Sequence, residues 1–325
     1  MFEEIIRMNN LLQAWQEFLP GKKDKPDVAE FGANLFANLY LLHEELKSKT
    51  YLHGPYKHFR INDPKPRDIH KPIVRDRLLH HAMVRVLYPY FDKKFIFDSY
   101  SSRVGKGTHC AMKRFRNFAK TISQNDTRTV WVLKCDIKKF FASIDHAILK
   151  EILAKHVSDL DTLWLLGNVI DSFTIEGKPG TGLPLGNLTS QLLVNIYMNQ
   201  FDQFAKHKLK IKHYIRYADD FVFLSRDRKY LEQLFPVVFK HLDDRLKLST
   251  HPTKCSIKTF ASGIDFLGLV HFPNHRVLRT STKQRMLRNI NLVPKALSEA
   301  SVISYLEMLS WGNAWKVKML ISQTR

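Results

Sequence analysis

The chain has 325 residues, of which 44% are hydrophobic, so it can bury a substantial core and is longer than one typical domain. Its 51 Lys and Arg outnumber its 31 Asp and Glu, and the resulting formal net charge of +20 favours a polyanionic partner such as nucleic acid. The three cysteines lack CxxC spacing, which argues against a disulfide framework and a zinc site, and no run of about 18 uncharged apolar residues predicts a membrane span.

The first third of the sequence predicts helices separated by a turn. Residues 1–50 place apolar side chains at helix spacing. Pro64 and Pro66 then impose extended or turn backbone. A further amphipathic helix is predicted around residues 79–90, and glycines mark a loop at residues 101–108.

The middle third alternates strand and helix patterns. Residues 129–137, TVWVLKCDI, have the composition and length of a buried strand. Asp145 is a suitable N-cap for the helix that follows. After the glycine-rich segment GKPGTGLPLGN, at residues 177–187, apolar side chains predict another helix over residues 193–204.

Two strands and a tight turn are predicted in RYADDFVFL, residues 216–224, with the turn at residues 217–220. From Ser281 onward the pattern is basic and helical, with an interruption at Pro294. We interpret this last part as a small separate subdomain.

Carboxylates occur at both of these predicted strand ends. Asp219 and Asp220 occupy the turn, and Asp136 ends the earlier strand. If the two strands are neighbours, three acids converge and repel one another unless divalent cations neutralise them. Two Mg²⁺ ions in such a place support phosphoryl transfer, whereas the alternative is an Asx-rich turn without metal.

Several motifs in order resemble those of the reverse transcriptases. The resemblance spans roughly residues 60 to 320. The motifs are KPRDIHKPIVRDR (65–77), SYSSRVGKGTHCA (99–111), DIKKFFASIDH (136–146), GLPLGNLTSQ (182–191), YADD (217–220), LSTHPTKCSI (248–257) and DFLGL (265–269).

The resemblance implies an α+β right-hand polymerase, with fingers, a palm containing an antiparallel sheet, and a helical thumb. Residues 1–110 are expected to form an N-terminal extension and fingers. The palm is expected over residues 111–272, with an interleaved fingers segment at about 147–185. Residues 273–325 are expected to form the thumb.

By the same resemblance, Asp136, Asp219 and Asp220 bind two Mg²⁺ ions, for which Mn²⁺ is a substitute. The backbone carbonyl of Ile137 is expected to assist. The primer 3′-hydroxyl then attacks the α-phosphate of a dNTP, and pyrophosphate leaves. Lys254 lies where the family has a lysine that can protonate the pyrophosphate, with plain phosphate contact as the alternative.

Other motif positions imply contacts with the nucleotide. Arg67 and Arg75 match the region where family members clamp the triphosphate, a task that suits the guanidinium, although a solvated basic face is the alternative. Phe141 falls where these enzymes place a bulky side chain beneath the sugar, so that it would exclude a 2′-hydroxyl. Ordinary core packing is the alternative for Phe141.

The primer strand is expected to contact a turn formed by Phe266, Leu267 and Gly268, where glycine permits close backbone approach. A plain hairpin is the alternative. The histidines, including His80 and His81, show no metal-ligand spacing and are expected at the surface or in stacking contacts.

The GLPLGNLTSQ block resembles the enzymes of diversity-generating retroelements, in which an aliphatic residue, here Leu185, replaces a glutamine before Gly186, and a Ser-Gln pair ending at Gln191 closes the block. The segment SYLEMLSWGNAW (304–315) is similar to that group as well. Such enzymes copy a template-repeat RNA with frequent errors opposite adenine, and the cDNA replaces part of a target gene. They work with a basic accessory variability protein. Losing an amide that contacts the nucleotide would remove hydrogen bonds that reject a poor pair, unless Leu185 merely packs.

The sequence is also compatible with other functions. A reverse transcriptase of a retron, a group II intron or an antiphage defence system is one alternative, and an RNA-dependent RNA polymerase is another. A catalytically silent RNA-binding protein with a polymerase fold belongs to a different class. We expect a cytoplasmic protein, prokaryotic or phage-encoded, that uses an RNA template, a DNA or RNA primer and dNTPs. With no RNase H or endonuclease segment recognised before Arg325, template removal is expected to fall to another protein.

Overall fold

The computed structural model describes residues 1–62, 65–292, 299–315 and 317–319. The chain forms two compact units, each built from separate stretches of sequence. Unit 1 contains residues 1–103, 137–210 and 239–249, and unit 2 contains residues 104–136, 211–238 and 250–325. No helix in the described ranges is long and apolar enough to cross a bilayer.

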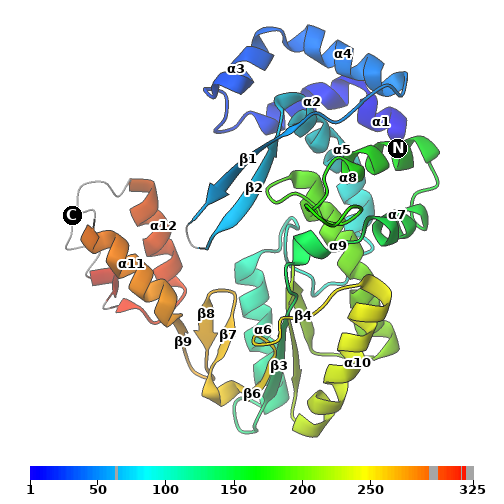
Figure 1. Cartoon of the computed structure of the whole chain (residues 1–325). Coiled ribbons are helices and arrows are strands. Elements are labelled where there is room, and N and C mark those ends of the chain that lie inside the picture. Colours follow the sequence, from blue (N-terminus) through cyan, green and yellow to red (C-terminus); the bar gives the residue numbers. More distant parts are fainter. Residues whose placement is uncertain (63–64, 293–298, 316, 320–325) are drawn as a thin grey trace. The chain divides into compact units, whose positions relative to one another are not determined.

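Unit 1 is mostly helical (Figure 1). Its helices are α1 (Phe2–Ile6), α2 (Met8–Phe18), α3 (Pro26–Ala33), α4 (Leu35–Lys47), α5 (Val74–Asp92), η1 (Phe140–Ser143), α7 (His146–Ala154), α8 (Leu160–Asp171), α9 (Leu188–Gln203) and η2 (Phe204–Lys208). Helix α10 (Arg228–Leu246) begins in unit 2 and ends in unit 1. The long helix α5 packs against α1, α2 and α9, because its buried apolar residues recur at helix spacing. The amphipathic helix predicted around residues 79–90 is therefore confirmed.

A two-stranded antiparallel hairpin completes unit 1. Its strands are β1 (Tyr56–Ile61) and β2 (Arg67–Pro72). Most of β1 is exposed, so the strand lacks the apolar alternation that would have predicted it. Helix α8 was also not predicted, although Asp159 caps it by accepting hydrogen bonds from the N–H groups of Asp161 and Thr162.

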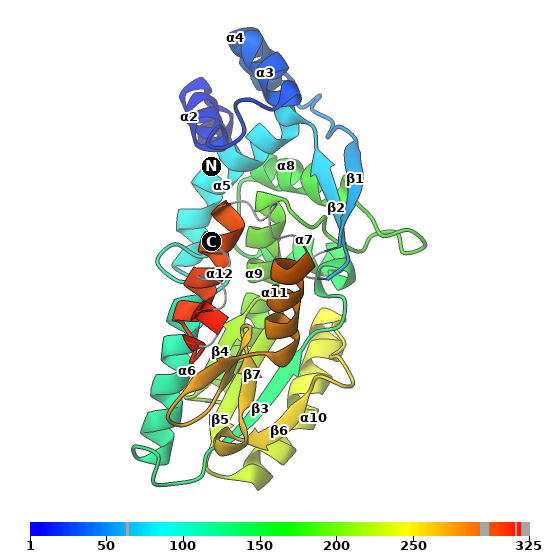
Figure 2. The same ribbon diagram turned by 90° about the vertical axis from the view of Figure 1, so that its left-hand side faces the viewer.

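Unit 2 contains a four-stranded antiparallel sheet in the order β4-β5-β3-β6. The strands are β3 (Trp131–Asp136), β4 (Tyr214–Tyr217), β5 (Asp220–Ser225) and β6 (Ser256–Thr259). Helix α6 (Thr108–Ser123) runs along this sheet and packs against β4 and β5 (Figure 2). Residues 221–224 of β5 are all buried, so this strand is covered on both faces.

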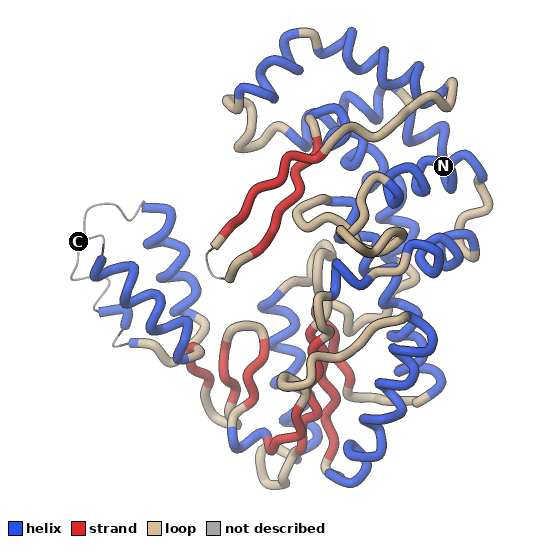
Figure 3. The backbone as a smooth tube through the Cα atoms, viewed as in Figure 1, coloured by secondary structure: helices blue, strands red, loops and turns tan. Residues whose placement is uncertain are grey.

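A second, three-stranded sheet lies in unit 2 with the C-terminal helices (Figure 3). The sheet consists of β7 (Ile264–Phe266), β8 (Leu269–His271) and β9 (Arg276–Leu278). The helices of this part of the chain are η3 (Phe260–Ser262), α11 (Thr280–Leu292) and α12 (Glu299–Ser310). A buried cluster joins Met112 of α6 to Leu278, Met286 and Leu309. The C-terminal helices therefore pack against α6 through apolar side chains. The interruption expected at Pro294 lies outside the described residues.

The expected domain boundaries at residues 110 and 272, and the interleaved fingers segment, stay predictions. The grouping of the chain into units follows contacts between segments distant in sequence, and one unit combines residues 104–136 with residues 250–325.

Candidate active site

The three predicted catalytic acids lie together at one end of the unit 2 sheet. Asp136 ends β3 and Asp220 begins β5, and the two residues are direct partners in the antiparallel register. Tyr217 pairs with Asp220 across the hairpin, so Ala218 and Asp219 form its two-residue turn. Ala218 adopts a left-handed conformation with φ 53°. The tight turn predicted from the sequence is confirmed.

Two lysines neutralise the acids on the paired strands. The Lys134 ammonium lies 3.3 Å from Asp220 Oδ2 and donates a hydrogen bond of 2.6 Å to the backbone carbonyl of Asp265. The Lys254 ammonium lies 2.9 Å from Asp136 Oδ1. Lys134 was missed in the sequence, although its spacing of two residues from Asp136 places both side chains on the same face of β3.

Asp220 is a buried acid whose pKa is shifted. Its side chain is only 17% exposed, and burial raises the pKa of its carboxyl to about 7. The charges of Asp219 and Asp136 add to this rise, whereas Lys134 opposes it. Its buried Oδ1 has no hydrogen-bond partner among the described residues.

The described residues hold no group of three or more His, Cys, Asp or Glu side chains arranged so that it could bind a metal ion. The three acids therefore do not form the expected metal-binding group in this arrangement, because Lys134 and Lys254 are paired with two of them. The residues nevertheless fit a divalent cation. The unpartnered oxygen and raised pKa of Asp220 are what a carboxylate shows when its stabilising charge is incomplete.

The nucleotide-contact candidates of unit 1 lie on η1 and on the loop before α9. Phe141 is half-buried in η1 and packs edge-on against Phe140 at 5.6 Å. The N–H of Leu183 donates to the Phe141 carbonyl at 2.8 Å, so this loop is tied to η1. Leu185 is half-buried, and Gly186 is exposed with φ +99°, a conformation that favours glycine.

Gln191 lies in the first turn of α9 and is half-buried. Ile137, whose carbonyl is a predicted metal ligand, is buried. The role of each of these residues stays a prediction.

The two predicted phosphate-binding arginines differ in their surroundings. Arg67 is exposed at the start of β2. Arg75 pairs with Glu45 at 2.8 Å, donates to the Leu52 carbonyl at 2.6 Å, and lies over the Tyr51 ring at 5.1 Å. These contacts hold Arg75 between α4 and α5, and the triphosphate role expected of Arg67 and Arg75 stays a prediction.

The predicted primer-contact turn is a hairpin turn between β7 and β8. Leu267 and Gly268 both have positive φ, 52° and 89°, which fits a two-residue turn. Phe266 is fully buried and packs against Phe115 at 5.2 Å. Its side chain is therefore part of the core, and only the turn itself is left to approach a strand.

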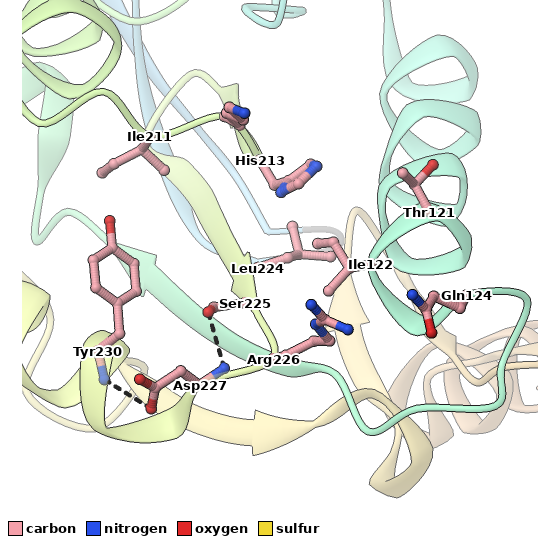
Figure 4. A pocket seen from close by; sticks show the side chains of 11 residues that line it. Thr121, Ile122, Gln124, Ile211, His213, Leu224, Ser225, Arg226, Asp227 and Tyr230 are labelled. Atoms are coloured by element: carbon pink, nitrogen blue, oxygen red, sulfur yellow. Dashed lines mark hydrogen bonds between the residues drawn. The ribbon is translucent and has the colours of Figure 1, made fainter.

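A cavity of about 550 Å³ lies at the other end of the same sheet, where β5 ends and α10 begins (Figure 4). The N–H of Asp227 donates to Ser225 Oγ, and the N–H of Tyr230 donates to Asp227 Oδ1. Because Asp220 begins β5 and Ser225 ends it, this cavity is one strand length from the acids. It is therefore separate from the candidate catalytic centre.

Comparisons with known proteins agree on one family. Residues 62–271 match the family described as "Reverse transcriptase (RNA-dependent DNA polymerase)". Protein YkfC of Escherichia coli is 25% identical over 88% of this chain and 82% of its own length. The group II intron-encoded protein LtrA of Lactococcus lactis subsp. cremoris is 26% identical over 65% of this chain and 33% of its own length.

Among solved structures, apo telomerase from Candida tropicalis superposes with a TM-score of 0.54 at 12% identity, covering 68% of this chain and 48% of that one. The chain thus spans about a third of the length of LtrA and about half of the telomerase chain. The likeness supports the fold alone, and with the family match it confirms the α+β right-hand polymerase fold. Members of this family generally use divalent metal ions. The catalytic motifs, the paired acids and the match over residues 62–271 lead to one conclusion: the chain belongs to the reverse transcriptase, or RNA-directed DNA polymerase, family.

Proposed function

We propose that this protein copies an RNA template into cDNA, with the acids of unit 2 as its catalytic centre. The observation that supports this most directly is the pairing of Asp136 with Asp220 beside the Asp219 turn. These acids, with the Ile137 carbonyl, would hold the Mg²⁺ ions, which activate the primer hydroxyl and offset the charge on the triphosphate. Lys254 is close enough to the centre to donate a proton to the leaving pyrophosphate.

The other candidate residues take roles in binding. Arg67 contacts the triphosphate as an exposed guanidinium, and Phe141 excludes the 2′-hydroxyl of an rNTP. The turn at Leu267 and Gly268 contacts the primer through its backbone. The substrates are an RNA template, a DNA or RNA primer and dNTPs, and we expect a cytoplasmic setting.

Primer extension tests the catalytic proposal. The purified protein is supplied with a primed RNA template, dNTPs and Mg²⁺, and is compared with Asp219→Asn and with Asp243→Asn, an exposed acid of α10. We expect extension by the unmodified protein and by Asp243→Asn, and none by Asp219→Asn. Equal extension by Asp219→Asn would refute the assigned centre. Tight RNA binding without any extension would favour a silent RNA-binding protein.

We further propose that the enzyme is error-prone opposite adenine and serves a diversity-generating retroelement, together with a basic accessory variability protein. Leu185 supports this proposal, because an aliphatic side chain in this half-buried loop cannot supply the hydrogen bonds with which an amide would reject a poor base pair. We expect Leu185→Gln to lower misincorporation opposite template adenine, and the matched apolar variant Leu185→Ile to leave it unchanged. Sequencing of the cDNA measures both.

A second candidate is a group II intron type of reverse transcriptase, which the similarity to LtrA favours. Faithful cDNA from the unmodified protein, with and without the accessory protein, would support this candidate. If Leu185→Gln and the unmodified protein misincorporate equally, Leu185 has no role in fidelity.

A further inference from the structure

Two of the three cysteines face each other across the four-stranded sheet of unit 2. Strands β3 and β6 are antiparallel, and Lys134 is paired with Ser256. Cys135 is the next residue of β3 and Cys255 directly precedes β6, so the same register places these two cysteines opposite one another. Because they lie far apart in the chain, their spacing in the sequence gave no sign of a pair.

The two sulfurs are reduced and in contact. Both residues are free cysteines, and the Cys135 thiol donates a hydrogen bond to the Cys255 sulfur. Residues directly opposite in an antiparallel pair have Cα atoms about 4.5–5.5 Å apart, within the range of roughly 4.4–6.8 Å that a disulfide spans. A bond between the two sulfurs therefore requires no large movement of the backbone.

Further hydrogen bonds converge on the Cys255 sulfur. It also accepts from the Asp136 N–H and from the Thr250 hydroxyl. Donors around a sulfur stabilise its thiolate, which is the form that peroxide oxidises. Cys255 is half-buried beside the edge strand β6, whereas Cys135 is 0% exposed. An oxidant therefore reaches Cys255 first, and Cys135 lies against it as the second thiol.

Two candidate catalytic groups adjoin the cysteine pair. Asp136 follows Cys135 in β3, and Lys254 precedes Cys255. The Lys254 ammonium lies 2.9 Å from Asp136 Oδ1. A chemical change at the two sulfurs therefore acts directly on the backbone that carries both groups.

We propose that hydrogen peroxide converts Cys135 and Cys255 into a reversible disulfide, which switches the polymerase off. The Cys255 sulfur attacks one oxygen of the peroxide, the O–O bond breaks, and the hydroxide that leaves takes the thiol proton to become water. The Cys135 sulfur then attacks the sulfur of the resulting sulfenic acid, and the S–O bond breaks to release a second water. The two thiols together lose two electrons, which reduce the peroxide, and a dithiol reductant reverses the bond.

The disulfide acts on catalysis in two ways. A disulfide sulfur carries no negative charge and is a weak acceptor, so the Asp136 N–H loses its partner. The bond also ties the start of β6 to β3, which keeps Lys254 against Asp136 when Mg²⁺ and the dNTP need both groups free. This effect on catalysis rests on the function proposed above, whereas formation of the disulfide does not.

Thiol mapping tests the disulfide without any catalysis. The reduced protein is treated with hydrogen peroxide, its remaining thiols are blocked with N-ethylmaleimide, and its peptides are mapped by mass spectrometry without reduction. We expect a cross-linked pair of peptides that contain Cys135 and Cys255, lighter by two hydrogen atoms than the separate peptides, and its loss after dithiothreitol. The proposal would be overturned if Cys255 were still blocked by the maleimide when the exposed Cys110 had been oxidised, or if Cys255 were oxidised without a link to Cys135.

Serine variants identify the role of each sulfur. Cys135→Ser should halt at a sulfenic acid on Cys255, which dimedone labels, and Cys255→Ser should form neither product. Cys110→Ser, which removes the exposed third cysteine, is the matched control and should form the link as the unmodified protein does. Dimedone labelling of Cys135 in Cys255→Ser would contradict the assigned order of attack.

Primer extension before peroxide, after peroxide and after dithiothreitol tests the switch. We expect the unmodified protein and Cys110→Ser to lose extension with peroxide and to regain it with dithiothreitol. A cross-linked protein that extends primers as fast as the reduced protein would overturn the role in regulation. If the reduced protein extends no primer, the proposed function fails, while the thiol map still decides whether the disulfide forms.

Discussion

Asp220→Asn should stabilise the protein in the absence of metal, although it abolishes catalysis under our proposal. The raised pKa of Asp220 means that the folded protein holds a proton that the unfolded chain releases between pH 3.8 and about 7. The free energy of unfolding therefore falls as the pH rises through this window. Above pH 7 the cost of the buried charge is fully present.

The size of this cost follows from the change in pKa. A rise from 3.8 to about 7 corresponds to about 4 kcal/mol, since each pKa unit is worth about 1.4 kcal/mol. Asparagine carries no charge and avoids this cost, but it also gives up the ion pair with Lys134 at 3.3 Å. We therefore expect a net gain of about 2 kcal/mol at pH 8, equivalent to a rise in Tm of roughly 3 °C for a chain of 325 residues.

Thermal unfolding in EDTA between pH 5 and pH 8.5 measures this effect. The gain should be present at pH 8 and shrink toward pH 5, where Asp220 is protonated. Added Mg²⁺ should raise the Tm of the unmodified protein more than that of Asp220→Asn, and Asp243→Asn serves as the exposed control. A variant that is no more stable than the unmodified protein at pH 8, or a gain that does not depend on pH, would refute the reasoning.

Three further substitutions test packing and selectivity. Phe141→Ala should raise the use of rNTP relative to dNTP by ~10-fold or more in a competition assay, and an unchanged ratio would leave Phe141 as a packing residue only. Met112→Ala removes a 2% exposed side chain from the cluster that joins α6 to the C-terminal helices. It should lower the free energy of unfolding by about 2–5 kcal/mol in urea, and a loss below ~1 kcal/mol would mean that the site collapses around the gap. Asp145→Ala removes both the cap on the Ile148 N–H at 3.0 Å and the ion pair with Lys247 at 2.6 Å. It should cost about 1–2 kcal/mol, whereas Lys247→Ala, which breaks only the exposed pair, should cost less than ~1 kcal/mol.

Local sequence patterns predicted several elements of the fold. The strand predicted at residues 129–137 is β3, the N-cap predicted at Asp145 accepts a hydrogen bond from Ile148, and the turn at residues 217–220 joins β4 to β5. The hairpin of β1 and β2 was missed, because β1 is mostly exposed and lacks the apolar alternation of a half-buried strand. His80 was expected at the surface or in stacking contacts; it is buried, and its ring lies 5.3 Å from that of His53.

The candidate site also combines features that the sequence predicted with features that only the tertiary structure determined. Strand alternation and turn residues place Asp136, Asp219 and Asp220 within short stretches of chain, and the motif order indicates the family. The sequence by itself therefore predicted the fold class and the position of the candidate catalytic acids at strand ends. The partners of these acids were decided by the tertiary structure alone. Lys254 is 118 positions from Asp136, and the pairing depends on how β6 aligns beside β3. A periodic pattern in the sequence indicates which face of a helix or strand is buried. Only the tertiary packing determines which distant charged groups and cavities lie against that face.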